Sequence, residues 1–168
     1  MKTIEIYEFH ELPEDVQRKV HENFGYMENP WADDDWDTWK KFIKDVFPNV
    51  IKDWSYGYRD TWITCYDNEW SDVHGEELRD YLSEVLDRLG ENPTGYCADY
   101  SCYGYVRKNL DKIVERDMTA KDIAEDTFWH FCKKMDEDEA YCQSFEYFKE
   151  HAEAYAWHYT KNGKRVYE

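Results

Sequence analysis

The amino-acid sequence predicts an α+β fold, in which a small antiparallel sheet of short strands packs with about five amphipathic helices. Two observations support this class. Several segments repeat apolar residues at helical spacing, and shorter segments between them are rich in β-branched and aromatic residues. Helices and strands follow one another irregularly, which is not typical of repeated β-α-β units. The length of 168 residues suits one domain, so we predict a single acidic domain over residues 1–168.

The first half of the chain predicts strands and helices in alternation. Bulky residues occupy both faces of a predicted strand at 3–9, and apolar residues recur every fourth position in a predicted helix at 13–25. A helix from Trp36 ends before Pro48, because the residue before a proline disfavours the helical conformation. The segments 49–59 and 61–67 predict a hairpin that turns at Arg59 and Asp60.

The second half predicts further helices and two strand regions. Six apolar residues form one stripe over 76–89, and Gly90 ends that helix. The segment TGYCADYSCYGYVR, residues 94–107, predicts a strand that is buried on one face and bent near Gly104. Three more helices are predicted, at 110–114, after a capping Thr119, and over 141–155. Asn162 and Gly163 between alternating residues predict a closing hairpin.

The charge balance excludes a free-standing nucleic-acid binder. The chain has 21 Lys+Arg and 38 Asp+Glu, a formal net charge of −17, whereas phosphate-binding surfaces need clustered basic residues. Solubility of a small domain needs a net charge of only about 2–8 in magnitude. Disorder is also excluded: the mean hydropathy is −0.99, but 8 Trp, 15 Tyr and 8 Phe provide the aromatic residues that disordered chains lack.

The acidic residues fall within predicted folded elements, so the charge is a property of a shaped surface. We predict that part of this surface binds a partner, with two tryptophans as anchors, because aromatic residues are enriched at interface hot spots. The candidate partner-binding residues are Asp33, Asp34, Asp35, Asp37, Asp67, Glu69, Asp72, Trp31 and Trp70. Trp36 and Trp39 share an apolar helix stripe and are predicted to pack in the core.

Such a surface could imitate a nucleic acid. Duplex DNA carries about two charges per base pair, so a net charge of −17 corresponds to about eight base pairs. A basic groove would then attract the protein by electrostatic steering, without any base-specific chemistry. The alternative is that the acidic surface only keeps the domain solvated.

Motifs for catalysis or metal binding are absent from the sequence. We find no glycine-rich phosphate loop, no zinc-protease motif and no nucleophile elbow. The five cysteines are odd in number and scattered, which predicts reduced thiols rather than a disulfide framework. Cys97 and Cys102 would lie on opposite faces of a strand, which disfavours a zinc site. We therefore predict no cofactor and no metal, while a cysteine–histidine pair that meets only in the fold stays open.

No segment is long and apolar enough for a membrane span, and the N-terminal residues MKTIEIYEFHELPED lack a signal-type apolar run. These observations predict a soluble, intracellular protein that neither enters a membrane nor binds nucleic acid directly. The sequence does not predict its oligomeric state.

The two ends of the chain resemble a known family. The opening IEIYEFHELPEDVQRKVHENF and the closing FEYFKEHAEAYAWHYTKNGKRVY are similar to a loose family of uncharacterised bacteriophage and prophage proteins, over about 50 residues. Members often carry a glycine-rich W-S-Q-G-D-G-A strand in the middle, where this chain reads WITCYDNEWSD. The resemblance implies a phage origin and a location in the cytoplasm of a bacterial host, and it implies no catalytic residue or cofactor.

Three functions are consistent with these observations. The first is a non-enzymatic, phage-type acidic inhibitor that occupies the basic DNA or RNA groove of a host defence enzyme, such as a CRISPR effector or restriction complex. The second is a small enzyme acting on a nucleotide or base, with a cysteine–histidine or carboxylate site in the tyrosine-rich region. The third is a phage structural or assembly protein. The first combines the folded acidic surface with the phage-like ends.

Overall fold

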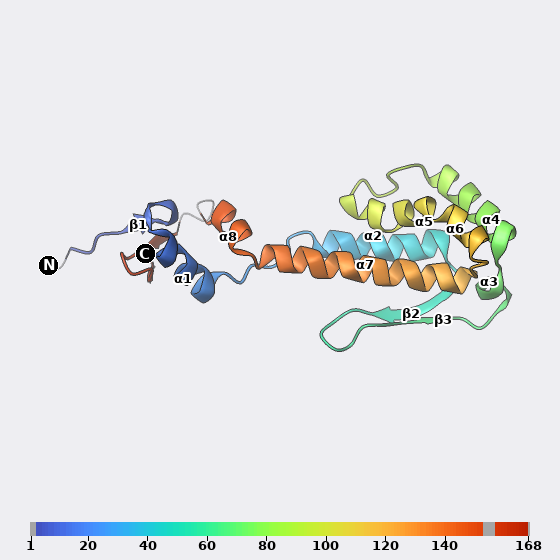
Figure 1. Cartoon of the computed structure of the whole chain (residues 1–168), viewed down its shortest axis with the longest axis horizontal. Helices are drawn as coiled ribbons and strands as arrows, with labels where there is room; N and C mark the ends of the chain where they lie inside the picture. Colours follow the sequence, from blue (N-terminus) through green and yellow to red (C-terminus); the bar gives the residue numbers. More distant parts are fainter. Residues whose placement is uncertain (1–2, 153–156, 168) are drawn as a thin grey trace. The chain divides into compact units, whose positions relative to one another are not determined.

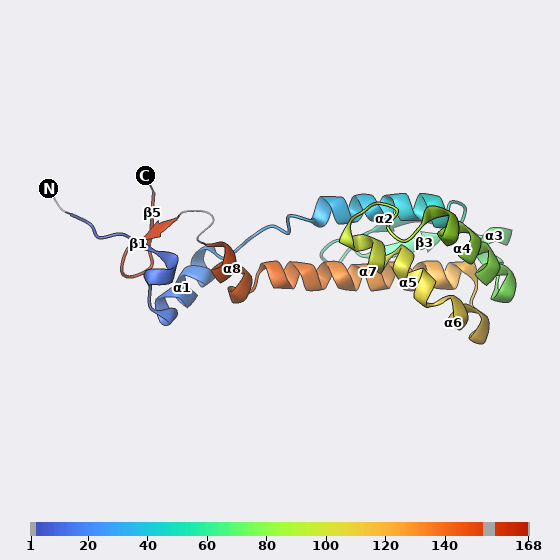
Figure 2. The same cartoon turned by 90° about the horizontal axis from the view of Figure 1, so that it is seen from above.

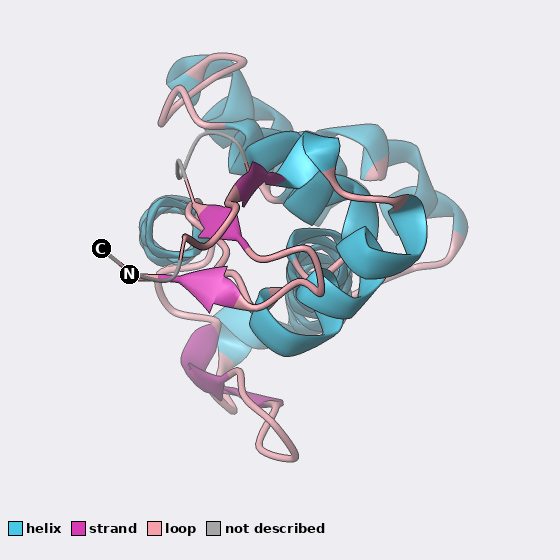
Figure 3. Ribbon diagram, turned by 90° about the vertical axis from the view of Figure 1, so that its left-hand side faces the viewer, coloured by secondary structure: helices cyan, strands magenta, loops and turns pink. Residues whose placement is uncertain are grey.

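The computed structural model describes residues 3–152 and 157–167, and the chain divides into two units. The terminal unit comprises residues 1–29 and 136–168, and the central unit comprises residues 30–135. Each unit has its own buried apolar core. The α+β class is confirmed: α-helices predominate and the strands are short and antiparallel, in two small sheets (Figure 3). The prediction of one domain over residues 1–168 stays a prediction.

The terminal unit joins the two ends of the chain in one three-stranded sheet. Its order is β1-β4-β5, formed by β1 (Tyr7–Glu8), β4 (His158–Tyr159) and β5 (Arg165–Val166). The 3-10 helix η1 (Phe9–Glu11), α1 (Glu14–Phe24) and α8 (Phe145–His151) accompany this sheet. Phe9 and Phe148 pack edge to face in its core, with ring centroids 5.3 Å apart. The predicted helix at 13–25 is confirmed by α1.

The predicted strand at 3–9 is largely wrong. Only Tyr7 and Glu8 pair with another strand, and the chain then turns into η1. The turn is stabilised because the Glu8 amide donates a hydrogen bond to Glu11 Oε1, at 3.0 Å. Ile4 and Ile6 are exposed, so the alternation of this segment does not correspond to a buried face.

The closing hairpin is confirmed. β4 and β5 pair antiparallel, and Gly163 in the turn has φ +87°, a conformation that favours glycine. The preceding helix, predicted over 141–155, begins later: Tyr141 belongs to α7, and Ser144 caps α8 by accepting a hydrogen bond from the Tyr147 amide. The predicted end of that helix, near Tyr155, lies outside the described residues.

The central unit contains most of the helices. They are α2 (Ala32–Val46), α3 (Glu69–Asp72), α4 (Gly75–Leu89), the 3-10 helix η2 (Cys97–Ser101), α5 (Tyr103–Lys108), α6 (Leu110–Glu115) and the start of α7 (Ala120–Cys142). Helices α2 and α7 lie side by side in both views (Figures 1 and 2). Trp39 of α2 lies between them in the core, with its ring 5.4 Å from Phe131 and 5.5 Å from Phe128.

The predicted hairpin of the central unit is confirmed. β2 (Ile51–Ser55) pairs antiparallel with β3 (Trp62–Cys65), and Arg59 in the turn has φ +59°. Trp54 of β2 stacks on Trp36 of α2 with ring centroids 5.0 Å apart, which attaches the hairpin to the helix. The predicted core positions of Trp36 and Trp39 are confirmed: Trp39 is fully buried, and Trp36 packs against the core.

The strand predicted at 94–107 is wrong, because this segment forms η2 and α5. The buried residues Ala98, Cys102, Tyr103 and Val106 follow helical spacing, whereas a strand would bury alternate residues. The turn before them is held by the buried Asp99 carboxylate, which accepts hydrogen bonds from Thr94 N, Thr94 Oγ1 and Gly95 N. The prediction that Cys97 and Cys102 lie on opposite faces of a strand is therefore wrong, because neither residue belongs to a strand.

The remaining predicted helices are present. The helix at 110–114 is α6, and the helix at 76–89 is α4. Thr119 caps α7, because Thr119 Oγ1 accepts a hydrogen bond from Asp122 N at 3.1 Å and Thr119 N donates to Asp122 Oδ2 at 3.0 Å. None of the described helices combines the length and apolar character required to cross a bilayer.

Candidate partner-binding site

The two predicted acidic clusters lie at opposite ends of α2 (Figure 1). Asp33, Asp34, Asp35 and Asp37 belong to its first turns. The segment carrying Asp67, Glu69 and Asp72 is hydrogen-bonded to the chain just after α2, through Asn68 Nδ2 to Asn49 O at 2.9 Å and Tyr66 N to Val50 O at 2.8 Å. A helix of 15 residues is about 22 Å long at 1.5 Å per residue, so the clusters do not meet.

One predicted residue of the first cluster is not on the surface. Asp35 is 4 % exposed, and its Oδ2 lies 3.2 Å from Nζ of Lys134. The prediction that Asp35 faces a partner is therefore wrong, because its carboxylate is buried against a lysine. Asp34 is half-buried, while Asp33, Asp37 and Trp31 are exposed.

Lysines interrupt the acidic surface along α2. Asp33 and Asp37 are followed at helical spacing by Lys40, Lys41 and Lys44, all of them exposed. Lys41 also pairs with Asp45. The exposed stripe of this helix thus changes from negative to positive along its length, and it does not form a continuous negative track between the two clusters.

The second cluster has no Lys or Arg within its own segment of the chain. Residues 60–78 contain six acidic residues and no Lys or Arg. Five of them lie on or beside α3 and the start of α4 and are exposed: Asp67, Glu69, Asp72, Glu76 and Glu77. Asn68 begins α3 by accepting a hydrogen bond from Ser71 N at 2.9 Å. Glu76 and Glu77 occupy the first turn of α4, where the helix dipole stabilises negative charge.

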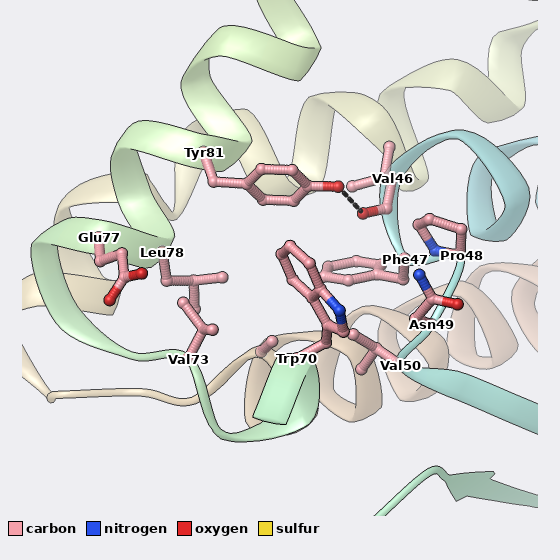
Figure 4. Close-up of a pocket in the computed structure, with 11 residues that line it drawn as sticks. Val46, Phe47, Pro48, Asn49, Val50, Trp70, Val73, Glu77, Leu78 and Tyr81 are labelled. Atoms are coloured by element: carbon pink, nitrogen blue, oxygen red, sulfur yellow. Dashed lines mark hydrogen bonds between the residues drawn. The ribbon is translucent and has the colours of Figure 1, made fainter. Parts of the chain in front are cut away.

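This acidic surface contains a pocket of about 230 Å³ (Figure 4). Its walls come from the end of α2 and the following loop, from α3, from α4 and from the start of α7. The lining residues are Val46, Phe47, Pro48, Asn49, Val50, Trp70, Val73, Glu77, Leu78, Tyr81 and Ala120. Most of these side chains are apolar, and the Tyr81 hydroxyl already donates a hydrogen bond to Val46 O, at 3.4 Å. The pocket therefore favours an apolar occupant.

Two of the aromatic side chains that line the pocket are exposed. Trp70 is 56 % exposed, and Figure 4 shows its indole extending toward Tyr81, with ring centroids 6.4 Å apart. Burial against the pocket raises the pKa of the Tyr81 hydroxyl. Of the two predicted tryptophan anchors, Trp70 thus lies in a pocket beside acidic residues. Trp31 is at the other end of α2.

The sequence indicated Trp70 and its acidic neighbours as candidates, but it did not indicate the pocket. Val46, Trp70, Tyr81 and Ala120 come from four separate segments, so no local pattern brings them together. One signal was present: Tyr81 interrupts the aliphatic stripe of α4, which contains Leu78, Leu82, Val85 and Leu86.

Three of the five cysteines are not activated as nucleophiles. All five are free thiols, and burial raises the pKa of Cys65 to about 11 and the pKa of Cys102 well above its ordinary value. Burial also raises the pKa of Cys142. A raised pKa keeps sulfur in the unreactive thiol form, whereas a nucleophilic cysteine requires a lowered one. These three thiols therefore lack the activation required by the cysteine-enzyme alternative.

One group of side chains in the described residues has metal-like spacing. Glu8, His10 and Glu11 have ligand atoms within 4.8 Å of one another, and all three residues are exposed. Glu11 Oε1 already accepts the Glu8 amide, so this carboxylate stabilises η1. The group belongs to the terminal unit, and none of its three residues lines the pocket.

Comparisons with known proteins give no family assignment. No protein-family model, curated protein or solved structure matches this chain. The function must therefore be inferred from the surface described above.

Proposed function

We propose that the protein is a non-enzymatic inhibitor that binds the basic nucleic-acid groove of a nucleic-acid-handling enzyme. The phage-like ends favour a defence enzyme of a bacterial host, such as a CRISPR effector or restriction complex. The observation that carries the proposal is the exposed acidic surface of α3 and the start of α4, which has no Lys or Arg between residues 60 and 78.

The carboxylates of this surface would occupy positions that phosphates occupy on DNA or RNA. Asp67, Glu69 and Asp72 project from a segment fixed by its hydrogen bonds to Asn49 and Val50. A fixed negative surface attracts a basic groove at long range and raises the association rate, while added salt screens this attraction. We place the main contact here, and we exclude Asp35 from it because that residue is buried.

The chemistry of the pocket favours this binding role over the enzyme alternative. Its volume of about 230 Å³ is below the roughly 300–1,000 Å³ typical of small-molecule sites. Among the described residues that line it, Glu77 carries the one carboxylate, and the Tyr81 hydroxyl is hydrogen-bonded. A catalytic site would need several converging polar groups.

Displacement of nucleic acid from a bound enzyme tests the proposal. The immobilised protein is first used to capture enzymes from a bacterial lysate, and the purified captured enzyme is loaded with a fluorescent DNA duplex or RNA. We expect the protein to displace the nucleic acid at 50 mM NaCl and to lose most of this ability at 300 mM NaCl. Failure to displace, or displacement that does not weaken with salt, would contradict the proposal.

Two triple variants of equal net charge locate the contact. Asp67→Asn, Glu69→Gln and Asp72→Asn together remove three charges from the proposed surface. The control triple Glu84→Gln, Asp87→Asn and Glu91→Gln removes three exposed charges elsewhere in the central unit. We expect the first triple to weaken displacement at least tenfold and the control to change it less than threefold. Equal losses would mean that net charge, rather than this surface, determines binding.

A further inference from the structure

We infer that the pocket beside Trp70 receives one apolar side chain from a partner segment in which basic residues flank that side chain. This inference rests on the proposed function and specifies the chemistry of its ligand. The pocket supplies the apolar part of the recognition, and the surrounding carboxylates supply the charge.

The apolar part follows from the walls of the pocket. Val50, Val73 and Leu78 form its sides. In the absence of a partner, Trp70 is 56 % exposed and Tyr81 is 36 % exposed. Tryptophan and tyrosine are among the residue types most enriched at interface hot spots, where they surround a buried group. A volume of about 230 Å³ has room for one large aliphatic or aromatic side chain but is small for a drug-sized ligand.

The charge of the occupant follows from the residues around the pocket. Glu77 lines it, Glu69 precedes Trp70, and Asp72 follows two residues later. An apolar side chain on an acidic segment would bring like charges together, which costs free energy. Lysine or arginine on both sides of the apolar residue would instead pair with these carboxylates.

A second copy of this chain is a poor occupant. In a symmetric dimer the same patch of both copies would meet, so the carboxylates of one would face those of the other. The net charge of −17 adds to this repulsion. Charge complementarity therefore favours a basic partner, which agrees with the groove of a nucleic-acid-binding enzyme.

Short peptides test this inference with the full-length protein. The probe is a fluorescently labelled peptide Lys-Arg-Leu-Arg-Lys, and its comparison peptide has alanine in place of leucine. Leucine buries about three more carbon groups than alanine, so we expect it to bind at least tenfold tighter. Fluorescence anisotropy at 50 mM NaCl measures both affinities. Equal affinities for the two peptides would overturn the inference.

Variants of the exposed aromatic residues locate the peptide. Trp70→Ala or Tyr81→Ala is expected to reduce the affinity for the leucine peptide to that for the alanine peptide. Trp129→Ala is the matched control, because Trp129 is 49 % exposed and lies outside the pocket lining. Circular dichroism verifies that each variant is folded. If Trp129→Ala weakens the leucine peptide as much as Trp70→Ala does, the pocket is not the binding site.

The two proposals fail in different ways. If nucleic acid is displaced from the enzyme but the two peptides bind equally, the acidic surface acts without the pocket. If the leucine peptide binds tighter but no nucleic acid is displaced, the pocket binds basic segments of a different class of partner. The triple variant Asp67→Asn, Glu69→Gln, Asp72→Asn should weaken the binding of both peptides. Trp70→Ala should weaken only the binding of the leucine peptide.

Discussion

At the scale of single residues, an acidic side chain has different roles in different places. Asp99 is 1 % exposed and stabilises the turn before η2 by accepting hydrogen bonds from Thr94 and Gly95. Asp35 is buried beside Lys134, whereas Asp67 and Glu69 are exposed on the proposed binding surface. A count of acidic residues therefore overestimates the charge available to a partner. Burial decides which carboxylates stabilise the fold and which remain available for binding.

The Asp35–Lys134 pair can be tested by removing its cation. Lys134→Met leaves the Asp35 carboxylate buried without this ammonium group, and we expect the unfolding free energy to fall by about 3 kcal/mol. Urea denaturation at pH 7 measures the change. Lys40→Met, at an exposed position of α2, serves as the control, with an expected change of about 0.5 kcal/mol or less.

The double variant Asp35→Leu, Lys134→Met separates loss of the pair from loss of packing. Replacing both residues removes the buried carboxylate that has lost the ammonium group of Lys134, so it should recover a large part of the lost stability. If the double variant is as unstable as Lys134→Met alone, loss of the contact between Asp35 and Lys134 is not the cause.

At the scale of elements, periodicity predicted most helices, because their buried stripes are regular in sequence. α1, α4 and α6 were predicted close to their observed bounds. The hairpins were predicted from their turn residues and from the strand-forming residues beside them. The segment 94–107 was mistaken for a strand because its tyrosines and cysteines are typical of strands, although its buried residues have helical spacing.

The candidate site was only partly predictable for the same reason. Trp70 and its acidic neighbours are adjacent in sequence, but the pocket walls come from segments that meet only in the tertiary structure. Asp35 carried a signal that was overlooked: it lies four residues before Trp39 and seven before Phe42, on the buried stripe of α2. An acidic residue on such a stripe is expected to be buried and paired.

The closing hairpin provides a prediction at this scale. A Cβ atom at Gly163 would lie 3.1 Å from Val16 Cγ1 and 3.1 Å from Val20 Cγ2, both on α1, and φ is +87°. Gly163→Ala should therefore combine backbone strain with crowding and destabilise the terminal unit by about 2–3 kcal/mol.

Gly95→Ala is a matched control for the backbone term. Gly95 has φ +79°, and a Cβ atom there would meet nothing within 4 Å, so only strain of about 1–2 kcal/mol is expected. Urea denaturation monitored by circular dichroism gives both values. If both variants lose the same unfolding free energy, crowding between residue 163 and α1 does not contribute.

At the scale of the whole molecule, the negative charge belongs to both units. The terminal unit contains 15 acidic and 7 basic residues, and the central unit contains 23 acidic and 14 basic residues. Neither unit neutralises the other, so like-charge repulsion acts within each. The proposed binding surface is thus a local concentration of a charge that is general to the chain.

High pH should reduce the unfolding free energy of the protein. Burial raises the pKa of Cys65 to about 11 and the pKa values of Tyr105 and Tyr159 to about 12, from ordinary values of 9 and 10. The folded state therefore holds these protons more tightly than the unfolded state does. The stability that they contribute is complete below about pH 9 and is lost as the pH rises toward 12. Urea denaturation at pH 8 and pH 10.5 should show the decrease.

Tyr159→Phe isolates one contribution to this pH dependence. Among the described residues, the buried Tyr159 hydroxyl has no hydrogen-bond partner, so its removal keeps the ring packing and deletes only the titrating group. We expect the variant to be as stable as the native protein at pH 8 and to lose less stability by pH 10.5. An unchanged pH dependence would show that Tyr159 does not contribute.

Salt should stabilise the free protein while it weakens the proposed complex. At low ionic strength the net charge of −17 repels itself in the folded state, and 500 mM NaCl shortens the screening length to less than 10 Å. Exposed pairs such as Arg18–Glu14 are weak, so their screening should cost less than the repulsion that is relieved. We therefore expect each thermal unfolding transition to move to higher temperature between 20 and 500 mM NaCl.

The Asp67→Asn, Glu69→Gln, Asp72→Asn triple should be more stable at 20 mM NaCl and should gain less from salt, because it starts with less repulsion. Calorimetry of both proteins tests this, and a melting temperature that falls with salt would mean that attractive ion pairs outweigh the repulsion.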